Sequence, residues 1–246
     1  MYQQVADELR REILSGRLQP GQQLPSENEL VARHRTTRST VRKAIAQIRS
    51  EGLAITKQGK GAFVRTRPTI QMIATSANYL DRRSSGISNF NAEVAAQGHR
   101  AEQLVQEVAA ISAPPEIAER LALDADEHVL VRRRLFLVDD HPMKTVDSYY
   151  PLTLVQGTSI ERPGRIRGGV HAALERERGV VIRRLVEELD ARMPTPDETD
   201  QLAIPPGVPV VHTWRTAYDS EGRPVALDTE LSPADRYIFR FVIDIS

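Results

Sequence analysis

Apolar residues at the start of the chain recur at the spacing of a helix. Val5, Leu9 and Ile13 are four positions apart and therefore share one helical face, and Gly16 follows as a C-terminal cap. Residues 18–21 are Leu-Gln-Pro-Gly, in which Pro fixes φ and Gly tolerates a positive φ. The pattern predicts a first helix followed by a turn.

Two more helices are predicted before residue 53. Ser26 and Glu29 have the spacing of a capping box, so a second helix begins there. A third helix follows residues 35–37. Its single buried stripe has apolar residues at i, i+3, i+4 and i+7, namely Val41, Ala44, Ile45 and Ile48. Its other sides are polar or basic, and residues 51–53 close it.

A short hairpin is predicted after the third helix. Residues 54–57 and 62–65 resemble two strands around Gln58-Gly59-Lys60-Gly61. A helix, a turn, a helix and then a hairpin is the layout of a winged helix-turn-helix. In that motif the last helix enters the major groove and the hairpin reaches the neighbouring DNA backbone or minor groove.

The remaining sequence contains a faint internal duplication. Leu121-Ala122-Leu123, Val129 and Arg134 recur at the same spacing as Leu202-Ala203-Ile204, Val210 and Arg215. Each copy continues into an acidic turn, a proline and a second extended segment, which predicts a short helix followed by a hairpin. Two such units can pair edge to edge into one mostly antiparallel sheet with helices on it. The predicted fold class is therefore α+β.

Domain boundaries follow from composition. Residues 66–87 are polar and poorly periodic, which is typical of a linker. We expect a DNA-binding domain at 1–67, a linker at 68–87 and an effector-binding and dimerisation domain at 88–246.

The charge distribution supports this division. The net charge is zero, yet residues 1–67 hold 13 Lys or Arg against 6 Asp or Glu. A basic segment joined to an acidic remainder is typical of a DNA-binding domain attached to a sensing domain, although charge alone is equally compatible with a chance basic surface.

Composition also excludes several classes of protein. The chain has no cysteine, so a disulfide framework, a thiolate zinc site and a cysteine nucleophile are excluded. No signal peptide and no run of about 20 apolar residues is visible, so we expect a cytoplasmic protein that does not enter a membrane. We expect no metal and no cofactor.

Several residues of the winged layout have the chemistry that DNA contacts need. Arg38 and Arg42 lie four positions apart near the start of the third helix, where their guanidinium groups can reach phosphates or the O6 and N7 acceptors of guanine. At the hairpin tip, Lys60 lies between glycines, which allow a close backbone approach to DNA. A single Arg or Lys is usually a solvated surface residue, but here the signals coincide. Further expected contacts are Thr37, Ser39, Thr40, Gly59 and Gly61.

These segments closely resemble the GntR-type winged helix. The resemblance covers residues 2–65 and is carried by 16–21, 24–30, 38–45, 51–53 and 59–64. It implies DNA contacts from Asn28, Thr37, Arg38, Ser39, Arg42 and Gly59. Members more often have an aromatic residue or glycine where this chain has Arg33-His34-Arg35. The change adds charge to the turn between the helices, and we include Arg35 among the expected DNA contacts.

The second domain resembles, more loosely, the HutC subgroup of that family, whose UTRA effector domain has a chorismate lyase-like fold. The similarity covers roughly 88–245 and is carried by 121–123, 133–135, 147–151, 222–224 and 235–237. It implies an effector pocket bordered by Phe90, Asn91, Arg134, Tyr149, Gly169 and His171. A structural alternative for Arg134, equally weighted, is an ion pair with Glu187 or Asp235.

The departures from that subgroup concern the effector. Members that bind phosphorylated sugars tend to have a second arginine where this chain has Phe136, and a carboxylate where it has Val146. A buried charge needs a partner, whereas an apolar ligand needs area. We therefore expect a less polar effector.

Two rival functions remain open at this level. The lyase-like fold allows an enzyme with an attached DNA-binding domain, but the six histidines are scattered and no nucleophile elbow or phosphate loop is present. A DNA binder without a ligand is the second rival, which the large second domain makes less favourable. The sequence favours a homodimeric regulator of double-stranded DNA. We expect it to be a repressor that binds a palindromic operator and is released by a small-molecule effector.

Overall fold

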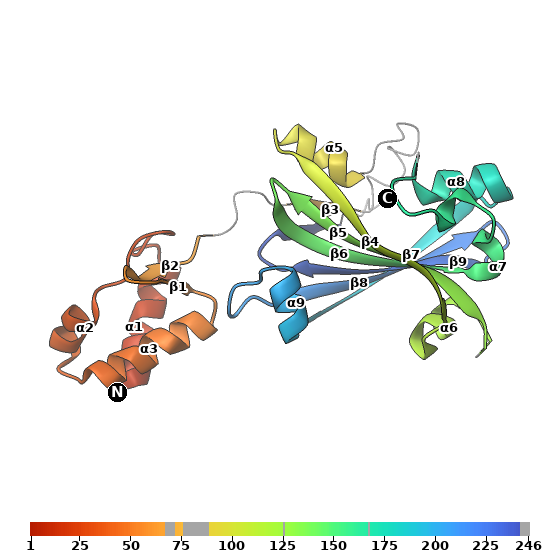
Figure 1. The fold of residues 1–246 in the computed structure, drawn as a ribbon. Coiled ribbons are helices and arrows are strands. Elements are labelled where there is room, and N and C mark those ends of the chain that lie inside the picture. The colour runs from red at the N-terminus through yellow and green to blue at the C-terminus, as the bar shows by residue number, and fades with distance from the viewer. Residues whose placement is uncertain (67–71, 76–88, 125, 167, 242–246) are drawn as a thin grey trace, which may run out of the picture. The chain divides into compact units, whose positions relative to one another are not determined.

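A computed structural model describes residues 1–66, 72–75, 89–124, 126–166 and 168–241 (Figure 1). Contacts divide the chain into two units, Met1–Thr69 with Met193–Pro209 and Ile70–Arg192 with Val210–Ser246. We call residues 1–66 the head. We call the six-stranded sheet, with the helices between residues 89 and 178, the body. Each is described by itself.

The head has three helices and a hairpin, as the sequence predicts. Its elements are α1 (Tyr2–Leu14), α2 (Glu27–His34), α3 (Arg38–Ser50), β1 (Ala54–Lys57) and β2 (Gly61–Val64). The predicted apolar faces form most of the core. Fully buried are Val5, Leu9, Leu30, Val41, Ala44 and Ile48, whereas Ile13 and Ile45 are only partly buried against them. Burial of these faces fixes which sides of α2 and α3 remain exposed.

Local capping explains where the second and third helices begin. The Ser26 hydroxyl accepts from the Glu29 amide at 3.2 Å, and the Glu29 carboxylate accepts from the Ser26 amide at 2.7 Å. Thr37 caps α3 by accepting from the Thr40 amide at 3.3 Å. These bonds satisfy backbone donors that an α-helix leaves free at its N-terminus.

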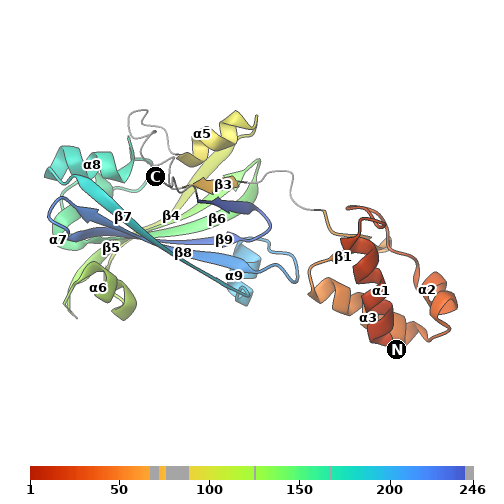
Figure 2. The ribbon, with the colours of Figure 1, turned by 180° about the vertical axis from the view of Figure 1, so that it is seen from behind.

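The body contains one antiparallel sheet in the order β4-β5-β6-β9-β8-β7 (Figures 1 and 2). Its strands are β4 (Ala101–Ser112), β5 (His128–Val138), β6 (His141–Pro151), β7 (Ile182–Arg192), β8 (Val210–Asp219) and β9 (Pro224–Pro233). Among the described residues beyond the head, the helical segments are α5 (Asn89–Ala96), α6 (Pro115–Leu121), α7 (Leu152–Val155), η1 (Ser159–Glu161), α8 (Gly169–Arg178) and α9 (Pro196–Gln201).

The strand order confirms the internal duplication and the α+β fold class. The units β4-α6-β5-β6 and β7-α9-β8-β9 follow each other in the chain, and β6 and β9 pair antiparallel at the centre, with Asp147 opposite Thr229. Ala122 and Ala203, one in each copy, both adopt the left-handed conformation, with φ of 51° and 46°. The duplicated sequence therefore places a left-handed alanine at the same position of both copies.

The helices of the body lie on two faces of the sheet, as Figures 1 and 2 show. α5, α7 and α8 lie on one face, which we call the α8 face, and α6 lies on the other. Side chains alternate along a strand, so β5 directs Leu130 and Phe136 to the α8 face and Val129 and Val131 to the α6 face.

Part of the predicted linker forms a strand. β3 (Met72–Thr75) pairs in parallel with β10 (Tyr237–Arg240). The rest of the linker expectation, residues 68–71 and 76–87, lies outside the described residues. No helix in the described part of the chain is long and apolar enough to cross a membrane.

Candidate nucleic-acid interface and effector site

The exposed side of α3 carries the predicted arginines. Because Val41, Ala44 and Ile48 face the core, the side chains of Arg38 and Arg42 are exposed. Ser39 is exposed between them, and the Thr37 and Thr40 hydroxyls lie 3.0 Å apart at the start of the helix. The structure therefore brings guanidinium and hydroxyl donors together on one helix end.

Both arginines are held by side chains of α2. Arg38 Nη2 donates to Asn28 Oδ1 at 3.0 Å. Arg42 Nε donates to both carboxylate oxygens of Glu27, at 2.9 and 3.1 Å. The hydrogen bond to Glu27, aided by its charge, raises the pKa of Arg42. Asn28 was an expected DNA contact. The contact of Glu27 with Arg42 was not predicted from the sequence, although Glu27 lies beside Ser26 and Asn28 at the start of the second helix.

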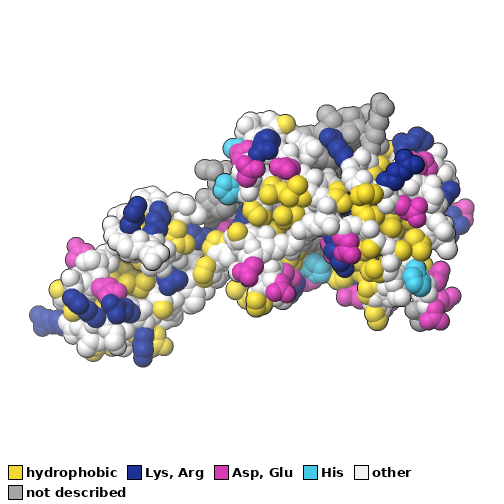
Figure 3. Space-filling view, in the orientation of Figure 1, with side chains coloured by type: hydrophobic (Ala, Val, Ile, Leu, Met, Phe, Trp, Pro, Cys, Tyr) yellow, Lys and Arg dark blue, Asp and Glu magenta, His cyan; other side chains and the backbone are white. Residues whose placement is uncertain are grey.

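The turn between α2 and α3 presents another cation. Arg35 ends α2 in the left-handed conformation, with φ of 48°, and its side chain is exposed. Arg33, the other arginine of that turn, instead lies 3.1 Å from Glu8 of α1. Figure 3 shows Lys and Arg side chains gathered over the α2 and α3 part of the head.

The hairpin tip has the expected backbone geometry. Gly59 and Gly61 have φ of 71° and 100°, which only glycine adopts readily. The exposed Lys60 lies between them, and its carbonyl accepts from Gln23 Nε2 at 2.8 Å. Lys60 is thus presented on a tip that is tied to the head. Lys57 lies over the ring of Phe63, 4.7 Å from its centroid.

Arg134 belongs to a polar network on the α8 face. Its Nη2 donates to Ser148 Oγ, which donates to the Asp228 carboxylate, and Arg134 Nη2 lies 4.0 Å from Asp228. The expected ion-pair partners are engaged elsewhere. Glu187 accepts from Arg215, and Asp235 lies 3.8 Å from Arg236.

An apolar cluster lies next to this network. The rings of Phe90 and Phe136 meet edge to face with centroids 5.0 Å apart, and Val146 is buried in the same cluster. Opposite Phe136 in the β5–β6 ladder is Lys144, which lies 5.3 Å from its ring centroid and 2.7 Å from Glu230. Burial acts to raise the pKa of Glu230, but the charges of Lys144, Arg215 and Arg134 and the hydrogen bond from Lys144 together outweigh it, so that pKa is lowered. The sequence reasoning missed this pair because it is formed across strands.

Arg132 anchors the segment that leads toward α8. It is 2% exposed and donates to three backbone carbonyls, those of Ile160, Arg162 and Gly164, at 2.5 to 2.7 Å. Burial lowers the pKa of this guanidinium. The side chain therefore fixes the backbone that precedes the predicted effector residues Gly169 and His171.

The expected effector residues do not all share a face. Tyr149 is packed with Val131 and Leu227 on the α6 face, so the structure does not support its assignment to the Arg134 site. The physical reason is strand alternation, which places the neighbouring Tyr150 on the α8 face. Burial raises the pKa of Tyr150 to about 12.

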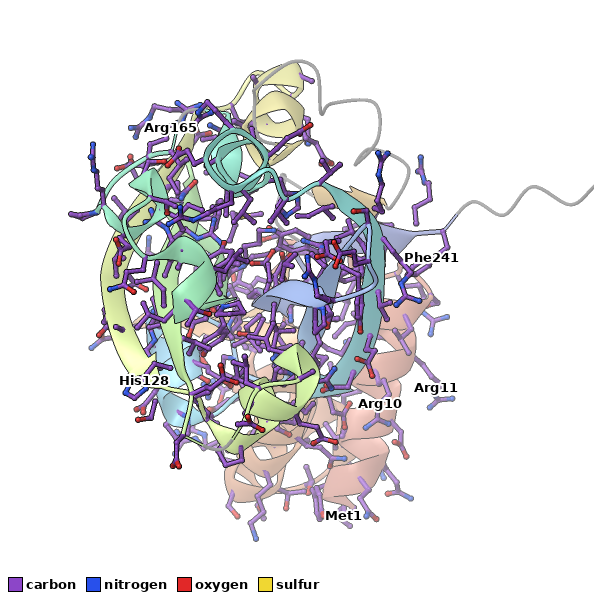
Figure 4. All side chains as sticks on the ribbon, turned by 90° about the vertical axis from the view of Figure 1, so that its right-hand side faces the viewer. Met1, Arg10, Arg11, His128, Arg165 and Phe241 are labelled. Atoms are coloured by element: carbon purple, nitrogen blue, oxygen red, sulfur yellow. The ribbon has the colours of Figure 1, made fainter. Side chains whose placement is uncertain are left out.

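The other expected effector residues belong to helices of the α8 face. Phe90 and the half-buried Asn91 lie on α5, Gly169 begins α8 with φ of 80°, and the half-buried His171 follows in the first turn. Figure 4 shows Arg165, in the loop before α8, on the side that carries α5 and α8, and His128 away from it. His128 is exposed at the start of β5.

Two family models match this chain. The model described as "Bacterial regulatory proteins, gntR family" matches residues 1–64, and the model of the UTRA domain matches residues 96–238.

Named relatives span most of the chain. The HTH-type transcriptional repressor NagR of Bacillus subtilis (strain 168) is 26% identical over 244 residues, which are 99% of this chain and 95% of that protein. The HTH-type transcriptional regulator Rv0792c of Mycobacterium tuberculosis is 30% identical over 241 residues, 96% of this chain and 83% of that protein.

Solved structures are similar along the whole length. A crystal structure assigned to the GntR family of transcriptional regulators has a TM-score of 0.73 and 28% identity, covering 100% of this chain and 98% of that one. PhnF from Mycobacterium smegmatis has a TM-score of 0.59 at 22% identity, covering 98% of this chain and 100% of that one, which shows the shared fold.

Proposed function

Because this chain belongs to the gntR family of bacterial regulatory proteins and carries a UTRA domain, we propose that it is a homodimeric repressor that leaves a two-fold symmetric operator when a small molecule binds. The family assignment makes the chain a DNA-binding transcription regulator with an effector domain, and not an enzyme. Relatives that are named repressors support repression, and not activation, of transcription. The proposal places the protein in the cytoplasm, where a bacterial regulator meets the chromosome.

The observation that carries DNA recognition is the exposed end of α3. Arg38 and Arg42 are directed outward by the buried stripe of α3 and are held by α2, and Lys60 is presented at the hairpin tip. In the proposed complex, Asn28, Arg35, Thr37, Ser39 and Thr40 complete the helix contacts, and Gly59 and Gly61 allow the backbone to approach DNA.

A homodimer is proposed because one winged helix contacts only a few base pairs, so useful specificity requires two heads on a symmetric site. In this proposal residues 1–67 bind DNA, 68–87 link the domains and 88–246 bind the effector and dimerise. Selection of bound duplexes from random DNA tests it. An inverted repeat with half-sites about 10 base pairs, or a multiple of that, apart is expected. Enrichment of an isolated half-site by a monomeric protein would contradict it.

The effector is proposed to bind on the α8 face beside Arg134, near Phe90, Asn91, Gly169 and His171. The Phe90–Phe136 contact and the buried Val146 support an effector that is less polar than a sugar phosphate. Lys144 restores a cation next to Phe136, but Glu230 neutralises it at 2.7 Å. Phe136 and Lys144 therefore offer no free anion clamp.

Thermal unfolding with a library of sugar phosphates and small aromatic or aliphatic carboxylates tests the effector class, because a ligand that binds only the folded state raises the melting temperature. We expect the largest shift from a carboxylate, and the largest shift from a sugar phosphate would overturn this part. The same ligand should weaken operator binding by about 1 to 3 kcal/mol. Operator affinity that no metabolite changes would favour the ligand-independent DNA binder.

A further inference from the structure

The Glu27–Arg42 contact leaves one specific part of the arginine available. Both carboxylate oxygens of Glu27 accept from Nε of Arg42, and neither terminal amino group of Arg42 donates a hydrogen bond within the described residues. The side chain of Arg42 is 68% exposed and that of Glu27 is 36% exposed. The fork formed by Nη1 and Nη2 therefore faces solvent while the Nε side is occupied.

That free fork matches a base edge. Two parallel N–H donors fit the O6 and N7 acceptors of guanine, which is the commonest specific contact of arginine in the major groove. Arg38 is held differently, because Asn28 accepts from its Nη2 at 3.0 Å. One of the two terminal amino groups of Arg38 is thus engaged, whereas both are free in Arg42. The two arginines are presented in different orientations.

A carboxylate at this place is costly for affinity. DNA binding depends on neutralising phosphates, so a negative charge beside the reading helix lowers attraction to any duplex. Glu27 is also held in place by the fold: it is the first residue of α2, which begins at the capping box of Ser26 and Glu29. The partial positive charge at that helix end stabilises its carboxylate.

We propose that Glu27 is a specificity-determining residue that holds Arg42 with its amino groups on one guanine and disfavours its use as a phosphate anchor. The Glu27 carboxylate raises specificity by repulsion. When Arg42 does not contact its guanine, the negative charge of Glu27 faces the DNA phosphates and weakens binding. This inference rests on the proposed DNA-binding function.

The test compares Glu27→Ala, Glu27→Gln, Arg42→Ala and the double variant Glu27→Ala/Arg42→Ala. Glu8→Gln is the matched control, because Glu8 is a half-buried glutamate of the same domain, with a side-chain exposure of 30% against 36% for Glu27, and it lies 3.1 Å from Arg33. Each protein is titrated against the selected duplex and all its single-base variants at fixed salt. All these variants leave the capping box of Ser26 and Glu29 intact, so the head should stay folded. Thermal unfolding checks this.

Arg42→Ala identifies the base pair that Arg42 reads. At that position the wild type should discriminate by roughly 5- to 150-fold. Glu27→Ala should lose most of this discrimination and bind the mismatched duplexes more tightly than the wild type. The double variant Glu27→Ala/Arg42→Ala should discriminate no less than Arg42→Ala alone. Glu27→Gln keeps an oxygen that accepts from Nε and should retain part of the ratio. Glu8→Gln should strengthen binding to all duplexes alike.

The outcomes separate the two claims. If Glu27→Ala keeps the full preference at that position, or if Arg42→Ala changes no single position, the role of Glu27 is overturned while DNA binding stands. If the wild type prefers no duplex at all, the proposed function fails, and the role of Glu27 fails with it.

Discussion

The head and the body hold their arginines in opposite ways. In the head, Arg42 is largely exposed and bonds to a carboxylate that is itself in contact with water. In the body, Arg132 is fully enclosed and donates to three backbone carbonyls. Exposed ion pairs contribute little to stability, whereas breaking a buried polar cluster is costly. An arginine held as in the head keeps donors that can contact DNA, whereas one held as in the body has its donors occupied by the fold.

Because of this difference, we expect substitution of Arg132 to have the largest effect on the free energy of unfolding. Arg132→Met should lower the free energy of unfolding by about 3 kcal/mol, because the carbonyls it satisfies lose a charged donor. Arg42→Met should change the stability by less than about 0.5 kcal/mol. Denaturant unfolding measures both. Equal midpoints for the two variants would remove the contrast between head and body.

DNA affinity should show the reverse order. Arg38→Ala and Arg42→Ala should each weaken binding to the selected duplex by about 1 to 3 kcal/mol if the residue reads a base. Fluorescence anisotropy measures this, and the melting temperature should stay at the wild-type value. Unchanged affinity in both variants would eliminate α3 as the reading helix.

Lys60 refines the comparison within the head. Lys60→Ala should weaken binding to every duplex alike and reduce the slope of log affinity against log salt by about 1, because it removes a phosphate contact rather than a base contact. Titrations at several salt concentrations measure the slope. A loss confined to one base pair would instead place Lys60 at a base edge.

The smallest expected effect concerns acid stability in the body. A hydrogen bond from the Ser159 amide, with others from the Ser159 hydroxyl and Arg176, lowers the pKa of Glu177 to about 2. Because the folded pKa lies below the unfolded value of about 4.5, the stabilisation is present above that value and is lost as pH falls toward 2.

Unfolding curves across this pH window test whether the stabilisation by Glu177 is lost on acidification. The stability difference between wild type and Glu177→Gln should shrink as pH falls. Glu119→Gln, at an exposed glutamate of α6, is the control and should give a nearly constant difference. A Glu177→Gln difference that grows on acidification would contradict the assignment.

The head was predictable because its signals are local. The spacing of Ser26 and Glu29, the i, i+3, i+4, i+7 stripe of α3 and the glycines beside Lys60 each act within a few residues. The duplication likewise indicated the two hairpins of the body, because both copies carry the same short pattern.

The remaining features depend on long-range pairing. Lys144 meets Phe136 and Glu230 only through the ladders of β6 with β5 and β9. Tyr149 and Tyr150 are neighbours in sequence, and the strand register decides which of them faces α8. β3 is four residues long and pairs with a strand near the C-terminus, so no local pattern indicated it.

The central claim is that α3 recognises a base sequence while Lys60 contacts the phosphates. The most direct measurement is the ratio of the dissociation constants for bulk DNA and for the selected duplex, taken with the wild-type chain at about 150 mM salt. We expect a preference of at least about 1,000-fold for the selected duplex. A ratio near one would contradict the account.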